Sequence, residues 1–164
     1  MPATPPEPRW LTPAEQQVWR RLVEVLVKVP AALEAQLQRD AGLTHMGYWV
    51  LVGLSEAPDR TLRMSELAAR SHSSLSRLSH LVARLESRGW VERRRHPDDG
   101  RVQLAVLTDA GFAVLAAAAP GHVEQVRALV FDRLTPEQVA ALGDVCARLA
   151  PGEEPVAGAP EGQS

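Results

Sequence analysis

Cysteine is almost absent from this sequence, since Cys146 is the single one among 164 residues. One cysteine excludes a disulfide within the chain and fits a reducing compartment. There is also no run of about 18 apolar residues that could span a bilayer. Residues 1–8 are proline-rich and have neither a basic start nor an apolar stretch, so they do not look like a signal peptide. We therefore expect a cytoplasmic protein without a membrane partner.

Aromatic residues are scarce too, at 4% of the chain, although 45% of the residues are hydrophobic. The core must therefore be built from Leu, Val and Ala. These residues favour helices, as do the many Arg and Glu residues. The length is that of one domain. Composition thus predicts a single, mainly helical domain.

The net charge of −2 argues at first against a nucleic-acid partner. Residues 60–101, however, contain ten arginines against five acids, a local charge of +5. The eight basic and fifteen acidic residues outside that segment give −7. A basic middle between acidic ends is the charge distribution expected of a protein that binds a polyanion.

The expected domain covers residues 12–150, between tails at residues 1–11 and 151–164 that offer little to bury. Its first helix starts with a capping box, in which Thr12 caps, Pro13 takes the first helical position and Glu15 reaches back. Apolar residues then recur at helical spacing as far as Asp40, and Pro30 is expected to kink the helix.

A second helix is expected over residues 44–55, buried because it is apolar nearly all round. Short elements follow: a strand at 61–64, a helix at 66–70 capped by Ser65, and a longer helix at 74–88. A hairpin comes next, with a strand at 91–96, a turn at 97–100 and a return strand. The return strand is expected to be half-buried, with Val102, Leu104 and Val106 on its inner face.

Two further helices complete the pattern. Thr108 is expected to cap the first of them, which Pro120 kinks or divides. Thr135 caps the last helix.

The helix at 74–88 has two faces. Its apolar face is expected to point into the core and carries Leu75, Leu78, Leu81, Val82 and Leu85. Its polar face carries small hydroxyls, an imidazole and two guanidinium groups: Ser74, Ser76, Arg77, His80 and Arg84.

A helix that enters the major groove needs slim residues near its start and a few donors of defined geometry. Arg77 is the best candidate to pair with guanine, and Ser74, Ser76 and His80 are further candidates for base contacts. Ser73 is expected to cap the helix and direct its first amides at a phosphate. Taken alone, the pattern also fits an ordinary amphipathic helix with a solvated face.

The hairpin favours the DNA-binding interpretation. Arg93, Arg94 and Arg95 on one strand and Arg101 after the turn gather four positive charges, which neither folding nor solubility requires. With Arg84, they are candidates for contacts to the phosphate backbone and the adjacent minor groove.

Several segments resemble the MarR (multiple antibiotic resistance regulator) family: Asp99-Gly100-Arg101, and residues 62–68, 78–91 and 106–111. The resemblance implies a mainly α fold with a small β wing. A winged helix-turn-helix at residues 44–108 would lie between dimerisation helices at 12–40 and 109–150. It also implies that Arg101 enters the minor groove and that Asp99 pairs with an arginine to hold the wing. Gly100 departs from the arginine often found there.

The residues support a homodimer independently, because the first and last helices have apolar faces that so small a central module cannot cover. Two-fold pairing would bury them. It would also set two recognition helices about 34 Å apart, which predicts a pseudo-palindromic operator on double-stranded DNA.

Other classes of function have less support. Cys146 suggests a redox sensor, but it lies in an apolar stripe where a thiol is expected to be buried and inert. The five histidines share no metal-ligand spacing, so no metal or other cofactor is expected. No phosphate loop, nucleophile elbow or paired carboxylates indicate an enzyme. A winged helix that binds protein instead of DNA is the remaining alternative.

The resemblance also suggests a small aromatic or phenolic effector bound between the dimer helices and the DNA-binding lobe. The side chains expected at that junction suit a planar anion: Trp10, Trp19, His45, Met46, Tyr48 and Trp49. Equally, these aromatics could be core or dimer contacts. The sequence therefore predicts a homodimeric repressor that such a ligand releases from DNA.

Overall fold

The structure, a computed structural model, describes residues 7–150. Its chain divides into two compact units, one up to Gln125 and one from Val126, which are described separately. Residues 7–11 belong to no helix or strand and are exposed, whereas the other residues of the expected tails, 1–6 and 151–164, lie outside the described range. Across residues 7–150, no helix is both long enough and apolar enough to cross a membrane.

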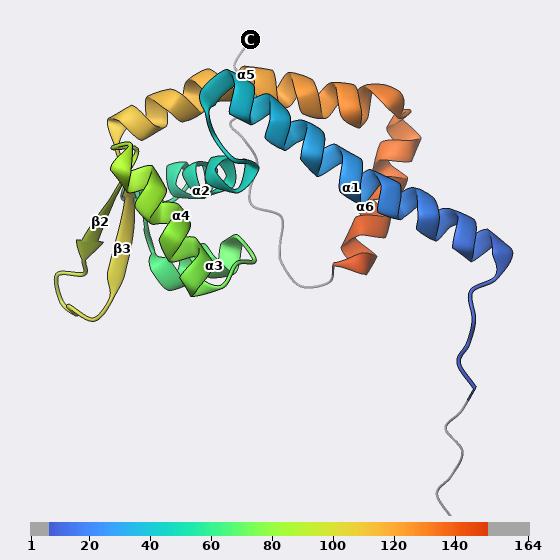
Figure 1. Cartoon of the computed structure of the whole chain (residues 1–164), viewed down its shortest axis with the longest axis horizontal. Coiled ribbons are helices and arrows are strands. Elements are labelled where there is room, and N and C mark those ends of the chain that lie inside the picture. The colour runs from blue at the N-terminus through green and yellow to red at the C-terminus, as the bar shows by residue number, and fades with distance from the viewer. Residues whose placement is uncertain (1–6, 151–164) are drawn as a thin grey trace, which may run out of the picture. The chain divides into compact units, whose positions relative to one another are not determined.

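Helix α1 (Pro13–Ala41) begins with the expected capping box. The Thr12 amide donates to Glu15 Oε2 at 2.7 Å, and Thr12 Oγ1 accepts from the Glu15 amide at 3.3 Å. The helix continues through Pro30 (Figure 1) and ends before Gly42. Only Leu33, Gln36 and Leu37, near its end, are buried.

Helix α2 (His45–Ser55) is capped by Thr44, whose Oγ1 accepts from the Gly47 amide at 2.9 Å. Val50, Leu51 and Leu54 are fully buried, but Trp49 is 54% exposed. The expected burial of α2 is therefore confirmed for most of the helix, with Met46 and Trp49 as its exposed residues.

The helix-turn-helix follows a 3-10 turn at Pro58–Arg60 and strand β1 (Thr61–Arg63), and consists of α3 (Met64–Arg70) and α4 (Leu75–Ser87). The expected cap of α3 was wrong. Arg63 is the cap residue, and its amide donates to Glu66 Oε2 at 3.1 Å, so the helix starts before Ser65.

Helix α4 is capped by Ser74, whose Oγ accepts from the Arg77 amide at 3.3 Å. The expectation that Ser73 caps this helix was therefore wrong. Ser73 lies one position too early, and its hydroxyl donates to the Ser74 carbonyl instead.

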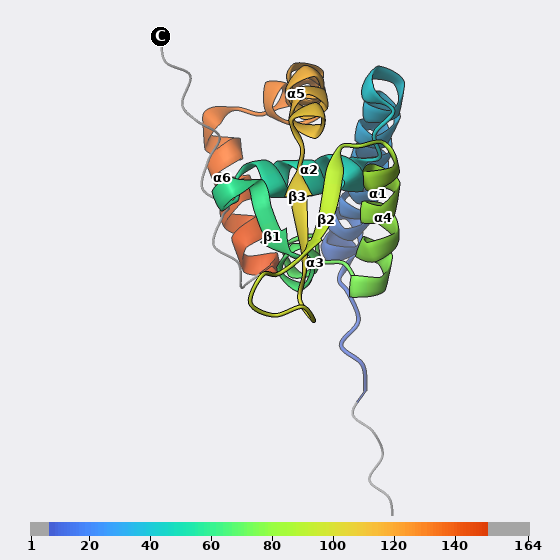
Figure 2. The same cartoon turned by 90° about the vertical axis from the view of Figure 1, so that its left-hand side faces the viewer.

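The wing is a hairpin of β2 (Val91–Arg95) and β3 (Gln103–Leu107). With β1 it forms an antiparallel sheet in the order β1-β3-β2. Figure 2 shows the three strands beside α4, below α2. The largest fully buried side chains come from α1, the α1–α2 turn, α2, the two helix-turn-helix helices and β2: Leu37, Leu43, Val50, Leu51, Leu54, Leu67, Leu78, Val82 and Val91.

The phase of β3 differs from the expected one. Ala105 and Leu107 are buried, whereas Leu104 and Val106 are only half-buried. Both faces of this short strand carry apolar residues, so alternation alone could not assign the inner face. The small Ala105 lies opposite Leu62 and Arg93, in the central strand of the sheet.

Helix α5 (Asp109–Leu129) starts where β3 ends, and Pro120 does not divide it. As expected, Thr108 caps it, because Thr108 Oγ1 accepts from the Gly111 amide at 3.0 Å. The same hydroxyl donates to the Gly89 carbonyl at 2.7 Å, which ties the start of α5 to the turn after α4. A Cβ on Gly111 would lie 2.1 Å from the Trp90 carbonyl oxygen, so this contact requires glycine.

The second unit contains the end of α5, a 3-10 turn at Phe131–Arg133 and α6 (Pro136–Leu149). As expected, Thr135 caps α6, in a capping box with Gln138. No residue of α6 is buried.

Candidate nucleic-acid interface

The polar face of α4 is exposed along its length. The side chains predicted to meet DNA from this helix and its cap all lie on the surface: Ser74, Ser76, Arg77, His80 and Arg84. On the opposite face Leu78, Leu81, Val82 and Leu85 are buried. The first turn carries slim serines beside Arg77, which lets the backbone approach the base edges of a duplex.

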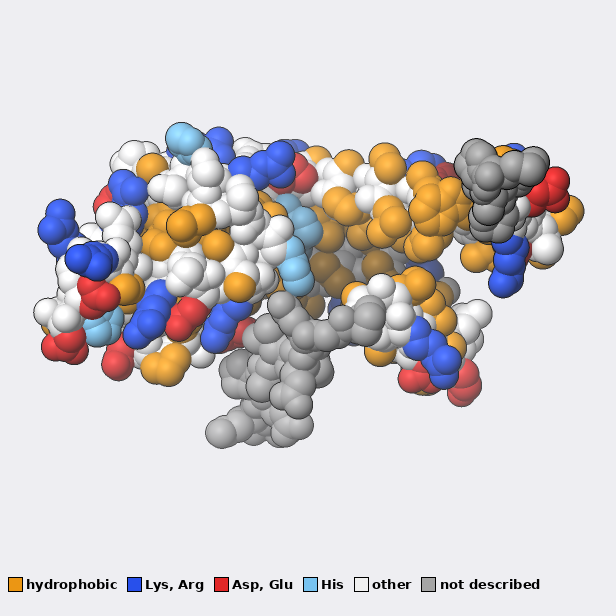
Figure 3. All heavy atoms as spheres, turned by 90° about the horizontal axis from the view of Figure 1, so that it is seen from below, with side chains coloured by type: hydrophobic (Ala, Val, Ile, Leu, Met, Phe, Trp, Pro, Cys, Tyr) orange, Lys and Arg blue, Asp and Glu red, His pale blue; other side chains and the backbone are white. Residues whose placement is uncertain are grey.

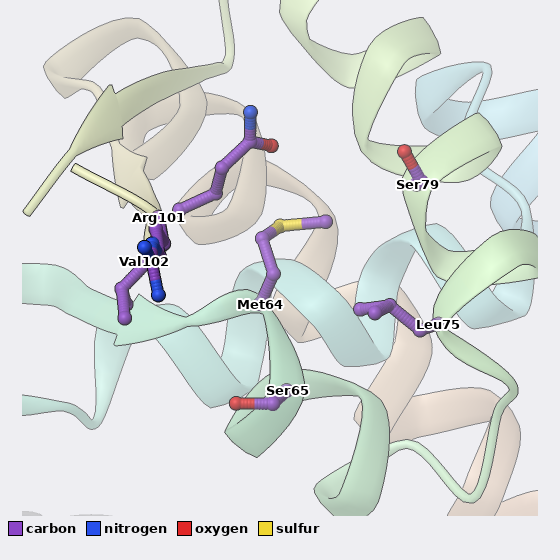
Figure 4. Close-up of a pocket in the computed structure, with 7 residues that line it drawn as sticks. Met64, Ser65, Leu75, Ser79, Arg101 and Val102 are labelled. Atoms are coloured by element: carbon purple, nitrogen blue, oxygen red, sulfur yellow. The ribbon is translucent and has the colours of Figure 1, made fainter. Parts of the chain in front are cut away.

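Leu75 does not follow the expected pattern, because it is 55% exposed rather than part of the core. It is the first residue of α4, directly after the Ser74 cap. With Met64, Ser65, Ser79 and the β3 end of the wing, it lines a hollow of about 360 Å³ (Figure 4).

The turn of the wing is held by Asp99 through the main chain. Asp99 Oδ1 accepts from the Arg101 amide at 3.0 Å, and the Asp99 carbonyl accepts from the Val102 amide at 2.9 Å. The resemblance implied that Asp99 pairs with an arginine, and the contact found here is with the amide of Arg101. This turn leaves Arg101 exposed.

The four wing arginines differ in their partners. Arg93 is half-buried and binds Glu86 of α4, with Nη2–Oε2 at 2.6 Å and Nε–Oε2 at 2.8 Å. Arg94 pairs with Glu92 at 2.7 Å on the surface. Within residues 7–150, Arg95 and Arg101 are exposed and no ion pair is found for either, so their charge is the most available to a phosphate.

These ion pairs affect the carboxylates. The hydrogen bond from the Arg93 side chain lowers the pKa of Glu86, and the bond from Arg94 lowers the pKa of Glu92. Both acids therefore stay ionised at neutral pH. The pair of Glu86 and Arg93 therefore links α4 to β2 of the wing. The sequence did not reveal this role of Arg93.

Two other arginines of the basic segment have internal roles. Arg88 Nη1 donates to the Gly42 carbonyl at 2.8 Å, and its guanidinium lies 4.8 Å from the centre of the Trp90 ring. Arg60 pairs with Asp109 at 3.0 Å and stacks 4.1 Å above the Phe112 ring. The local charge of +5 therefore overstates the charge that a duplex would meet.

A second group of side chains lies where α2 meets α5 within the first unit. Trp49 Nε1 donates to His45 Nε2 at 3.0 Å. The ring centre of His122 lies 4.3 Å from that of Tyr48 and 5.8 Å from that of His45. His122, from α5, was missed by sequence reasoning, because its neighbours are distant in the chain and a lone histidine has no local signal.

In this histidine group, which comprises His45, Tyr48, Trp49 and His122, Tyr48 and His122 are buried, His45 is half-buried and Trp49 is exposed. Burial lowers the pKa of both imidazoles. The charge of Glu34 opposes this change at His45, while the proximity of His45 adds to it at His122. Two buried polar atoms in this region, His122 Nδ1 and Gln36 Oε1, have no hydrogen-bond partner.

The remaining residues of the predicted ligand site lie elsewhere or face solvent. Trp10 is 82% exposed, and Met46 is 42% exposed. Trp19, 55% exposed, lies on α1 fifteen residues before Glu34, which accepts a hydrogen bond from the His45 amide. That separation is about 22 Å along the helix, so one chain does not bring Trp19 to the histidine group.

Cys146 was expected to be buried in an apolar stripe of α6, but it is exposed. The stripe has no partner within its own unit, so the argument from burial against redox sensing no longer applies. Among residues 7–150, no group of three or more His, Cys, Asp or Glu side chains could hold a metal ion.

Comparisons with known proteins agree with this geometry. The family model described as MarR family matches residues 41–102, which include the helix-turn-helix and β2. One solved structure is the crystal structure of Sco3205, a MarR family transcriptional regulator from Streptomyces coelicolor, in complex with DNA. The sequence of that chain is 53% identical to this one. That match covers 92% of this chain and 94% of the other, with a TM-score of 0.87.

AbsC, a MarR family transcriptional regulator from the same organism, is 39% identical over 87% of this chain and 95% of the other, with a TM-score of 0.83. The HTH-type transcriptional repressor YetL of Bacillus subtilis is 33% identical over 111 residues, 66% of each chain. The chain spans about half the length of the next curated relatives that it matches. These relatives are regulators, in agreement with the expectation that the chain is not an enzyme. The chain belongs to the MarR family of transcriptional regulators.

Proposed function

We propose that this chain binds double-stranded DNA sequence-specifically as a homodimer and represses transcription from the promoter it occupies. The observation that carries the proposal is the exposed polar face of α4 beside a wing whose Arg95 and Arg101 lack carboxylate partners within residues 7–150. The relative in complex with DNA, 53% identical over nearly the whole chain, supports it.

In this mechanism the two elements have different tasks. Arg77, in the first turn of α4, donates to the O6 and N7 atoms of a guanine, and Ser76 and His80 contact neighbouring base edges. Arg101 enters the minor groove, while Arg84 and Arg95 neutralise phosphates, which adds affinity without sequence preference.

The experiment is a selection of duplexes from a randomised pool by the native protein, followed by a titration of the best duplex. Arg77→Ala should weaken binding to it by about tenfold to a hundredfold and relax the preference at one base pair. Arg84→Ala is the matched control on the same helix, and should weaken selected and random duplexes alike. Failure to enrich any sequence, together with no salt-dependent binding to any duplex, would favour a protein-binding winged helix instead.

The proposed dimer follows from apolar side chains that the single chain leaves exposed (Figure 3, orange). On α1 these are Val18, Trp19, Val25, Leu26 and Val27, and on α6 they are Leu142, Val145 and Leu149. Two-fold pairing would bury both sets and set two copies of α4 one duplex turn apart on a pseudo-palindromic operator. The measurement is sedimentation, in which a dimer has twice the chain mass of 17.8 kDa.

The proposal extends to control of DNA binding by a small aromatic acid, for which the histidine group is the best-supported binding site. The unpartnered His122 Nδ1 and Gln36 Oε1 are buried polar atoms that a ligand's polar groups would satisfy. Trp49, half-exposed beside His45, offers an aromatic face. A ligand that prefers a dimer with wrongly spaced recognition helices would lower DNA affinity by its preference for that state.

The test uses benzoate and hydroxybenzoates as probes, with tryptophan fluorescence for binding and anisotropy for release of DNA. His122→Phe should abolish the response and leave DNA binding intact. An unchanged response in this variant would remove the histidine group as the effector site, and the DNA-binding proposal would stand.

A further inference from the structure

Leu75 differs from every other aliphatic residue on α4 that the sequence assigned to the core. Leu78, Leu81, Val82 and Leu85 are at most 7% exposed, whereas Leu75 is 55% exposed. Its place is the first turn of the helix, directly after the Ser74 cap and before Ser76. The part of α4 that approaches a duplex most closely thus presents a large apolar side chain among small polar ones.

The surroundings of Leu75 extend its apolar surface toward the wing. In Figure 4 its side chain points from α4 toward Met64, in the hollow that Val102 and Arg101 bound on the other side. Ser79, one turn along the helix from Leu75, lines the same hollow and is too small to shield it. Leu75 and the buried Met64 therefore line the same hollow, and Leu75 keeps more than half of its surface exposed.

The base edges of a duplex offer few apolar partners. In the major groove the C5-methyl group of thymine is the apolar feature that distinguishes one base pair from the others. An exposed leucine gains free energy when it excludes water against such a methyl group. Cytosine lacks this methyl group and therefore offers the leucine no such apolar partner.

We propose that Leu75 is a specificity-determining residue, which packs against the C5-methyl group of a thymine in the major groove. The inference rests on the proposed DNA-binding function. It adds an apolar contact to the polar ones from Ser76, Arg77 and His80, and predicts a required thymine beside the guanine that Arg77 contacts.

The test uses the full chain and the duplex that it selects from a randomised pool. Each thymine is replaced in turn by deoxyuridine, which removes the methyl group and keeps the Watson–Crick edge, and affinity is measured by anisotropy. At one thymine per recognition helix the replacement should weaken binding about fourfold, the value of one buried methyl-sized group. In Leu75→Ala that penalty should disappear, and in Leu75→Met it should persist.

Ser76→Ala is the matched control, and should keep the deoxyuridine penalty at the same thymine. The inference is overturned if no thymine shows a penalty with the native chain, or if the penalty is unchanged in Leu75→Ala. In both cases salt-dependent binding to the selected duplex would remain, so the proposed function would stand. Loss of all duplex binding by the native chain would overturn both. If Leu75→Ala folds poorly, the deoxyuridine scan of the native chain can still overturn the inference, because it needs no variant to show that no thymine carries a penalty.

Discussion

The arginines of the DNA-binding lobe differ in what their guanidinium groups contact. The guanidinium groups of Arg60 and Arg88 lie over the rings of Phe112 and Trp90, respectively. Arg93 pairs with Glu86. Arg95 and Arg101 are exposed on the wing. The clustering of charge in the sequence predicted a basic hairpin. It could not distinguish arginines that pair with groups of the same chain from arginines free to bind a phosphate, because the pairing partners are distant in the sequence.

Arg93 and Arg95, on the same strand, should therefore respond differently to alanine. Arg93→Ala leaves Glu86 without its partner and should lower the free energy of unfolding by about 1–2 kcal/mol. Arg95→Ala should leave stability unchanged and reduce the slope of log affinity against log salt by about 0.9 for each phosphate that the variant no longer neutralises. Urea denaturation and DNA titrations at several salt concentrations measure the two effects. Equal decreases in the stability of the two variants would contradict this assignment.

The buried histidines should make the fold sensitive to acid. Because burial lowers the pKa of His45 and His122 from 6.5 in the folded protein, the unfolded chain takes up protons first as the pH falls. Stability present above about pH 6.5 should therefore be lost progressively below it. Thermal unfolding of the native chain from about pH 7.5 to about pH 5.5 should show a fall in Tm that His122→Phe reduces.

His80→Ala, at an exposed position of α4, is the control for this measurement and should keep the native response to pH. Glu34 and Asp40 from α1 are the carboxylates around the group, with Glu34 bound to the His45 amide and Asp40 to Gln36. A Tm that stays level over this pH interval would show that the imidazoles are not held below their ordinary pKa.

At the level of helices and strands, three of the expected helix caps are confirmed, whereas features that depend on tertiary packing were assigned wrongly. Thr12, Thr108 and Thr135 cap their helices as expected, because a cap depends on residues within one turn. The cap of α3 and the inner face of β3 were wrong, since both depend on how the sheet meets the helices. Leu75 was misassigned for a similar reason: periodicity gives the face of a helix but not where the core beneath it ends.

The junction of the wing and α5 should tolerate no side chain at Gly111. Gly111→Ala brings a Cβ within 2.1 Å of the Trp90 carbonyl oxygen, so the start of α5 must move. We expect a loss of about 2–4 kcal/mol in the free energy of unfolding, of the size seen for overpacked sites. Chemical denaturation of the purified variant measures it.

Gly53→Ala is the matched control, because Gly53 lies inside α2 and its Cβ would meet only Leu67 Cδ1 at 3.8 Å. Here helix propensity should dominate, with a gain of about 0.5–1 kcal/mol. If Gly111→Ala were as stable as Gly53→Ala, the packing of α5 on the wing strand would be contradicted.

The dimer proposed for the whole molecule depends on apolar faces that the single chain leaves exposed. Val145 is 50% exposed on the apolar stripe of α6. Val145→Glu should convert the proposed dimer to monomer and lower affinity for a two-half-site duplex at least about a hundredfold, because each chain then binds one half-site alone. Ala147→Glu, on the opposite side of α6, should leave both properties unchanged. Sedimentation and DNA titration measure them, and a Val145→Glu variant that remains dimeric would exclude α6 from the interface.

The fold class and the order of the helices and strands could be predicted because motifs and caps are properties of short segments. The histidine group could not be assembled that way, since His122 comes from α5 and the other members from α2. Trp10 and Trp19 were grouped with them by residue type, while the length of α1 separates Trp19 from the group.

Joint binding of duplex DNA by the α4 face and the wing carries the proposed function. Its most direct test is the affinity of the native chain and of Arg95→Ala/Arg101→Ala for the selected duplex at several salt concentrations. The native chain should show a steep linear fall of log affinity with log salt. The double variant should show a weaker affinity and a slope shallower by about 0.9 for each phosphate left without its arginine. Identical salt dependence of the two proteins, or no salt-dependent binding by the native chain, would contradict the claim.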